Sequence, residues 1–152
     1  MTEQLKQLRN EIDAIDDELL RLINARAQLA QQVGRQKSGV VYRPERESQI
    51  FSRLQYANTG PLRNEHIEHL FTEIISICRA LEEPLTVAYL GPQGTFSEEA
   101  VTKRFGSAVN SMPCSSIDDI FRKVESGAAN YGVVPVENST EGAVGRTMDV
   151  LL

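Results

Sequence analysis

The first 38 residues carry an apolar repeat that neither proline nor glycine interrupts before Gly34. The apolar positions recur at alternating steps of three and four, which is the heptad seam of a long α-helix. They are Leu5, Leu8, Ile12, Ile15, Leu19, Leu22, Leu29 and Val33. A helix of this extent is roughly 50 Å long. No small domain buries so long a stripe alone, so the pattern predicts a long partner helix, most simply from a second copy of the chain.

Two cations interrupt this apolar face. Arg26 occupies a seam position, and Lys37 returns to the same face eleven residues later, about 16 Å along the axis. Cations on a buried face need an anion, so we expect the pair to converge on one small molecule with two anionic groups. Arg9 lies about 25 Å from Arg26 and about 100° around the helix. If Arg9 also binds this ligand, it does so from an antiparallel partner chain.

Two shorter helices are predicted next, completing an all-α domain over residues 1–83. The first begins at Pro44 and ends near Gly60, with Arg46 and Glu47 in its opening turn. The second has one apolar face and ends before Pro84. Two polar or weakly polar side chains, Cys78 and Glu82, lie one turn apart beside that face.

After Pro84 the pattern changes to alternating strands and helices. Strands are predicted at 85–90, 109–113 and 131–136, and helices at 97–105, 117–126 and from 143 onward. Ser97 and Ser116 are predicted N-caps, and Gly106 and Gly127 predicted stops. The order βαβαβα indicates a parallel sheet. Residues 84–152 are fewer than the roughly 100–150 of a usual domain, so we expect an incomplete α/β segment.

Composition narrows the class of protein. The chain is 41% hydrophobic and 24% charged with a net charge of −5, which argues against nucleic-acid binding. The polar N-terminus and the lack of a long apolar run favour a cytoplasmic protein with no membrane contact. Cys78 and Cys114 have no metal spacing, and His66 and His69 lack a third ligand nearby. We therefore expect no metal and no cofactor.

The helical segments LRNEIDAIDDELLRLINARAQLAQQVGRQK, VYRPERESQI and LFTEIISICRALE resemble the all-helical class of chorismate mutases over residues 3–83. The resemblance implies a homodimer with two intertwined sites that rearrange chorismate to prephenate. It implies that Arg26 and Arg9 of the other subunit clamp the two carboxylates. Lys37 would donate to the ether oxygen and to a carboxylate.

The same resemblance assigns roles on the two shorter helices. Glu47 would accept from the ring hydroxyl, and Arg46 would stand at the edge of the site. Cys78 occupies a position where some relatives have Ser, and Arg43 one where some have an acidic residue. Glu82 stands where some have a Gln that donates to the ether oxygen, and a carboxylate cannot donate. We therefore expect Glu82 to act in its protonated form and activity to fall as pH rises.

The second segment resembles the start of prephenate dehydratase, on VAYLGPQGTFSEEA and SSIDDIFRKVESGAANYGVVPVENSTEGAVG. In this order the two halves resemble the bifunctional enzymes of phenylalanine biosynthesis. The implied prephenate-site residues are Thr95, Ser97, Asn138, Ser139 and Thr140. The family's catalytic Thr-Arg-Phe motif and its phenylalanine-sensing domain do not occur in these 152 residues. We expect mutase activity without dehydratase activity.

Two other interpretations stay open. One is a non-enzymatic dimeric helical module that tethers a small-molecule-binding α/β domain; it gives no reason for cations at 26 and 37. The other is a degenerate mutase in which only the dehydratase half matters. A pericyclic rearrangement needs its substrate held folded and donors placed where charge develops, without a nucleophile. The lack of a Ser/His/Asp cluster therefore fits the mutase interpretation.

Overall fold

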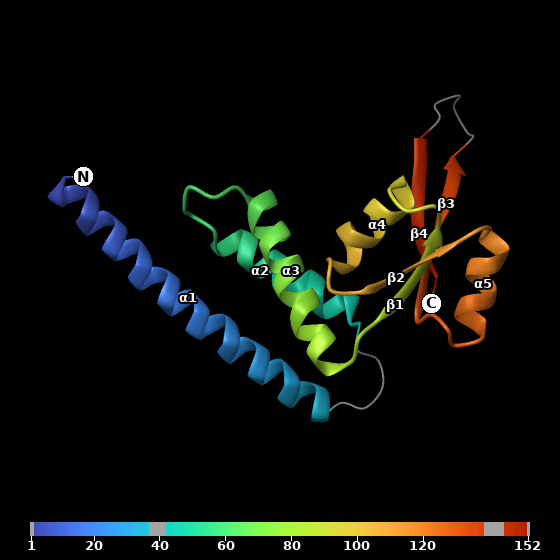
Figure 1. Cartoon of the computed structure of the whole chain (residues 1–152), viewed down its shortest axis with the longest axis horizontal. Coiled ribbons are helices and arrows are strands. Elements are labelled where there is room, and N and C mark those ends of the chain that lie inside the picture. Colours follow the sequence, from blue (N-terminus) through green and yellow to red (C-terminus); the bar gives the residue numbers. More distant parts are fainter. Residues whose placement is uncertain (1, 37–41, 139–144, 152) are drawn as a thin grey trace. The chain divides into compact units, whose positions relative to one another are not determined.

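The computed structural model describes residues 2–36, 42–138 and 145–151 (Figure 1). The chain divides into two compact units, Met1–Val41 and Tyr42–Leu152. The first unit is a single helix and the second combines two helices with an α/β sheet. Helices followed by a βαβ segment were predicted, and this order is confirmed.

The first unit is α1, Glu3–Gln36, a helix of 34 residues. The predicted long helix is therefore confirmed, while Lys37 and its neighbours up to residue 41 lie outside the described residues. None of the side chains of α1 is buried in this single chain. The seam leaves its leucines and isoleucines open to solvent, with Ile15 59% and Leu29 60% exposed.

Helices α2, Pro44–Ala57, and α3, Asn64–Glu82, form an antiparallel pair. Two ion pairs, Arg43–Glu82 and Glu47–Arg79, place the beginning of α2 beside the end of α3. Pro44 suits the first turn of α2 because that turn needs no N–H from it, and Pro84 lies just past the end of α3.

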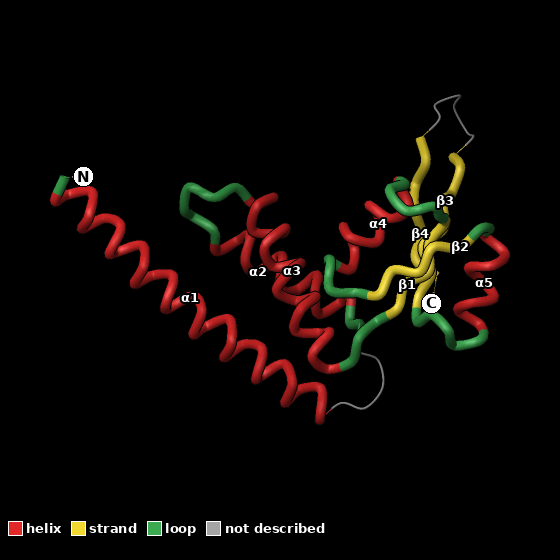
Figure 2. The backbone as a smooth tube through the Cα atoms, in the orientation of Figure 1, coloured by secondary structure: helices red, strands yellow, loops and turns green. Residues whose placement is uncertain are grey.

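The sheet contains β1, Thr86–Leu90, β2, Asn110–Cys114, β3, Tyr131–Asn138, and β4, Gly145–Leu151, in the order β2-β1-β3-β4. β1 is parallel to β2 and to β3. Two helices connect these strands: α4, Phe96–Phe105, and α5, Ile117–Glu125. Across the sheet, the chain moves in one direction from β1 to β2 and in the opposite direction from β2 to β3. Right-handed crossovers therefore place α4 and α5 on opposite faces (Figures 1 and 2).

The predicted helix from residue 143 is wrong. The chain instead forms β4, which pairs antiparallel with β3 from Asn138↔Gly145 to Gly132↔Leu151. The outer edge of β3 presents unpaired backbone N–H and C=O groups, and a strand satisfies them where a helix would not. This non-local pairing overrides the weak local pattern of residues 145–151, so the sheet is mixed rather than purely parallel.

The core lies on both faces of β1 and β3. Val87 and Tyr89 are fully buried on the same face as Val133, since side chains alternate along a strand. Phe105 of α4 packs on this face, where its ring contacts that of Tyr131. The other face, with Ala88 and Val134, packs with Ile120 of α5. Pro113 lies in β2, an edge strand, where a missing N–H is tolerated.

One of the two predicted helix caps is confirmed. Ser116 caps α5, and its Oγ accepts from the N–H of Asp119 at 3.0 Å. Ser97 does not cap α4: the helix begins at Phe96 after Thr95, and Ser97 is buried inside it. Two hydroxyl residues near one helix start make the local signal ambiguous, and the packing of α4 against the sheet decides between them.

Candidate active site

A carboxylate and an arginine mark the end of the α2–α3 pair. The side chain of Glu82, in the last turn of α3, is 9% exposed, and its Oε2 lies 3.6 Å from Nη1 of Arg43. That separation is beyond a hydrogen bond, and Oε2 has no hydrogen-bond partner among the described residues. Cys78, one turn earlier, is 4% exposed. The geometry leaves a buried acceptor that a substrate hydroxyl or a donated proton could satisfy.

A second carboxylate lies at the same end of the pair. Glu47, in the first turn of α2, accepts from Nη2 of Arg79 at 3.2 Å. Burial raises the pKa of Glu47, and the nearby cations Arg79 and Arg104 oppose that rise. The two side chains are 14% and 5% exposed, so solvent screens this ion pair weakly.

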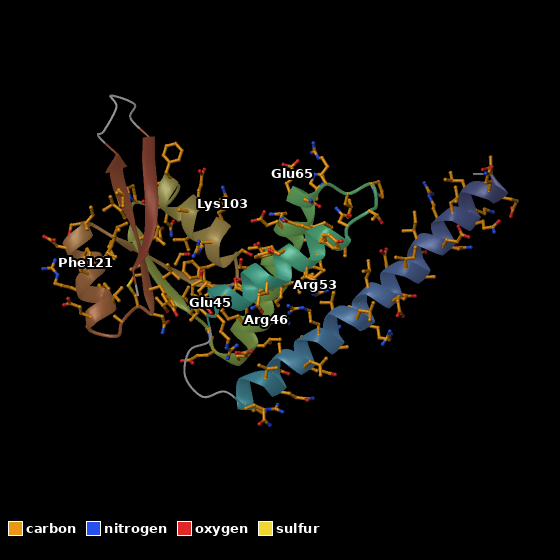
Figure 3. The ribbon with its side chains drawn as sticks, turned by 180° about the vertical axis from the view of Figure 1, so that it is seen from behind. Glu45, Arg46, Arg53, Glu65, Lys103 and Phe121 are labelled. Atoms are coloured by element: carbon orange, nitrogen blue, oxygen red, sulfur yellow. The ribbon has the colours of Figure 1, made fainter. Side chains whose placement is uncertain are left out.

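Arg46 occupies the outer side of α2. It is exposed, as is Arg53 two turns later, and both belong to the same helix face (Figure 3). Its predicted place at the edge of the site stays a prediction. Glu47, Cys78 and Glu82 lie at the end of the α2–α3 pair where α2 begins and α3 ends.

The remaining predicted mutase residues belong to the other unit. Arg9 and Arg26 lie on α1, and Lys37 is outside the described residues. Their predicted contact with the substrate therefore stays a prediction. The seam of α1 and the buried carboxylates of α2 and α3 are two separate parts of the predicted site.

Sequence reasoning missed Arg79, Tyr42 and Arg104. Arg79 Nη1 donates to the Phe105 carbonyl at 3.3 Å, and its guanidinium lies 5.2 Å from the centre of the Tyr42 ring. Arg104 Nε donates to the Tyr42 hydroxyl at 2.7 Å. The sequence signal for Arg79 lies near the end of α3. Ser76 and Arg79 stand there, around Cys78, among residues that are apolar or small nearly all round the helix, which is typical of a buried helix.

The three predicted dehydratase residues that the structure describes follow β1 or end β3. Thr95, at the start of α4, donates to the Leu90 carbonyl at 3.1 Å, and Ser97 is 4% exposed. Asn138 ends β3, while Ser139 and Thr140 lie outside the described residues. Ligands of α/β sheets commonly bind beyond this edge. The backbone therefore places Thr95, Ser97 and Asn138 at one edge of the sheet.

The described residues hold neither a metal-binding cluster nor a membrane-spanning helix. No group of three or more His, Cys, Asp or Glu side chains is arranged to hold a metal ion. No helix of the described chain is both long enough and apolar enough to cross a membrane. His66 makes a hydrogen bond at the first turn of α3, where its Nδ1 accepts from the N–H of Arg63 at 3.4 Å.

Comparison with known proteins matches both halves. Residues 8–83 match the family model for chorismate mutase type II, and residues 87–152 match that for prephenate dehydratase. A bifunctional chorismate mutase/prephenate dehydratase of Neisseria gonorrhoeae is 56% identical over 144 residues, covering 94% of this chain and 40% of that protein. The chain spans about two fifths of the length of the curated relatives it matches.

Two solved structures match the helical part. The chorismate mutase of Thermus thermophilus has a TM-score of 0.52 and 37% identity, covering 53% of this chain and 96% of that one. The chorismate mutase of Helicobacter pylori, solved in complex with prephenate, has a TM-score of 0.52 and 34% identity, covering 54% and 92%. The chain therefore belongs to the type II chorismate mutase family and continues into a segment of the prephenate dehydratase family.

Proposed function

We propose that this chain isomerises chorismate to prephenate. The observation that carries the proposal is Glu82 Oε2, a buried carboxylate oxygen without a hydrogen-bond partner among the described residues. Such an atom costs folding free energy, roughly 1–3 kcal/mol, so its retention points to a function. A substrate oxygen at this place would face Glu82, Cys78 and Arg43. The carboxylate Glu47, at the same helix-pair end, would accept from the ring hydroxyl.

The chemistry follows from positioning alone. Breaking the ether bond of chorismate while the new carbon–carbon bond forms requires the folded conformer of the substrate, held by its two carboxylates. Arg26 and Arg9 of the second subunit would supply that clamp. Lys37 and a protonated Glu82 would donate to the ether oxygen, where negative charge grows in the transition state.

The working form in this proposal is a homodimer. The exposed seam of α1 supports it, because Leu8, Ile12 and Leu19 are each about half exposed on one continuous face. Two such helices side by side would remove these side chains from water. Arg9 would then act in the site of the opposite subunit, so that catalysis would require the dimer to assemble.

For residues 84–152 we propose a prephenate-binding role within a longer reaction sequence towards phenylalanine. Thr95, Ser97 and Asn138 at one sheet edge support this, and Ser139 and Thr140 would extend the same site. N–H groups at the start of α4 can receive a carboxylate. The names of the bifunctional relatives suggest the same order of reactions.

The test is turnover of chorismate by the purified chain, measured as the loss of chorismate absorbance. The variant Arg26→Ala should lower kcat/KM roughly a hundredfold, since it removes charged hydrogen bonds to a carboxylate. Arg21→Ala is the matched control, because Arg21 is exposed and pairs with Glu18 one turn away on the same helix. No turnover by the parent would contradict the proposal and favour the non-enzymatic helical module. Equal loss in both variants would contradict the clamp.

A further inference from the structure

Arg79 is a nearly buried cation that none of the predicted mutase roles uses. Its side chain is 5% exposed. Arginine is almost never this buried unless it is paired. Its Nε finds no acceptor among the described residues. The position of the guanidinium must therefore be set by the other contacts that it makes.

Those contacts come from two sides. On the mutase side, Nη2 donates to Glu47 of α2 at 3.2 Å. On the dehydratase side, Nη1 donates to the carbonyl of Phe105, the last residue of α4, at 3.3 Å. The guanidinium also lies 5.2 Å from the ring centre of Tyr42 and 6.0 Å from that of Phe105, within cation–π range.

The aromatic side of this arrangement, formed by Tyr42 and Phe105, is itself fixed. The Tyr42 and Phe105 ring centres are 4.8 Å apart, and both rings contact Tyr131 of β3. Arg104 donates to the Tyr42 hydroxyl at 2.7 Å. Arg79 therefore meets a packed aromatic cluster anchored on the sheet.

The charges around Glu47 stabilise its ion pair with Arg79. Burial raises the pKa of Glu47, and the charges that oppose the rise are Arg79 from α3 and Arg104 from α4. Without Arg79, the Glu47 carboxylate would lose its direct donor while still largely removed from water. Both its orientation and its charge would change.

We propose that Arg79 is a positioning residue which fixes Glu47 for the mutase reaction and is itself held by Tyr42 and by Phe105 of the dehydratase segment, so that this segment supports the mutase site. The inference rests on the proposed mutase function. It makes the two halves physically interdependent: a change in the turn after α4 reaches a mutase carboxylate through one side chain.

The experiment is a double-mutant cycle on mutase kinetics with the whole chain. The variants are Arg79→Gln, Glu47→Gln and the two combined. Arg79→Lys keeps the charge with different geometry and guards against a variant that fails to fold. Arg122→Gln is the matched control, since Arg122 is exposed on α5, on the sheet face opposite α4. Thermal unfolding is recorded for every variant.

We expect Arg79→Gln to raise KM about tenfold or more while kcat changes less, because a lost contact to a charged group weakens substrate and transition state alike. The double variant should be no worse than Glu47→Gln alone, and Arg79→Lys should retain part of the affinity that Arg79→Gln loses. Additive effects, or a fall in kcat at constant KM that follows the loss of folded protein, would overturn the inference while leaving the mutase function intact. A parent chain without turnover would overturn both.

Discussion

Gly106 lies so close to Ser76 that a side chain at position 106 has no room. A Cβ there would overlap the Ser76 side chain, lying 2.6 Å from its Oγ and 3.2 Å from the carbonyl oxygen of Thr72. Gly106 has φ 75° and ψ −174°, a conformation that essentially only glycine adopts. Ser76 in turn accepts from the N–H of Ala108 at 3.1 Å. The turn after α4 is therefore seated directly on α3.

Gly106→Ala should destabilise the chain by about 3 kcal/mol, the sum of backbone strain and overpacking. Gly127→Ala is the control, because Gly127 has a similar φ of 81° but, apart from its chain neighbours, no heavy atom of the described residues lies within 4 Å of an added Cβ. It should cost about 1 kcal/mol from strain alone. Urea unfolding at one protein concentration measures both. Equal losses would show that the contact with α3 does not matter.

A buried tyrosine should make the stability of the sheet depend on alkaline pH. Tyr89 is fully buried and donates to Glu98 of α4. Burial, then the hydrogen bond and charge of Glu98, raise the pKa of Tyr89 to about 12 from 10. A group whose pKa is raised on folding contributes stability that is complete below the unfolded value and is lost as pH rises through the folded one. The loss from Tyr89 should fall between about pH 10 and pH 12.

Tyr89→Phe isolates this effect. At neutral pH the variant should be less stable by about 2 kcal/mol, for the lost hydrogen bond to a carboxylate. The difference from the parent should shrink as pH rises from 10 to 12, since Phe does not titrate. Tyr56→Phe, at a residue 94% exposed, serves as the control. A difference that stays constant over this pH range would contradict the assignment.

Local rules predicted much of this fold. Pro44 and Pro84 bracket the two shorter helices, Ser116 caps α5, and Gly106 ends α4 as expected. Each of these depends on the chemistry of one or two neighbouring residues. The predicted heptad helix of the first unit is also confirmed, because its apolar period repeats many times along one helix.

Non-local relationships escaped prediction. β4 forms because β3 offers an open edge, which residues 145–151 do not encode by themselves. The Glu47–Arg79 pair needs the antiparallel register of α2 and α3, which brings together residues 32 positions apart. Of the candidate site, Glu47, Cys78 and Glu82 could be named from the resemblance. Arg79, which holds one of them, could not.

The role proposed for Glu82 predicts a distinctive pH–rate profile. A carboxyl group donates to the ether oxygen only while protonated, whereas its present neighbour Arg43, 3.6 Å away, pairs with the charged form. We expect kcat/KM for chorismate to fall as pH rises and Glu82→Gln to flatten that fall, because an amide donates at every pH. If the Glu82→Gln variant kept the pH dependence of the parent, the role would be excluded.

The dehydratase half should give no product in this chain. The Thr-Arg-Phe tripeptide that the resemblance assigns to catalysis is absent from the 152 residues. With prephenate as substrate, we expect phenylpyruvate to form no faster than in buffer at the same pH, because acid alone also converts prephenate. Formation above this background, proportional to protein concentration, would show that other residues carry the reaction.

Charge placed in the α1 seam should remove assembly and mutase activity together. Leu19→Asp introduces a carboxylate where the proposed dimer buries leucine, and an unpaired buried charge costs several kcal/mol. Because Arg9 is proposed to act in the opposite subunit, the resulting monomer should lose chorismate turnover even though Glu47 and Glu82 are untouched. Sedimentation and turnover measured on the same samples test this, with Asp17→Asn, on the helix but off the seam, as control. A monomer with full activity would refute the shared site, and a dimer without activity would locate the defect in the seam's cations rather than in assembly.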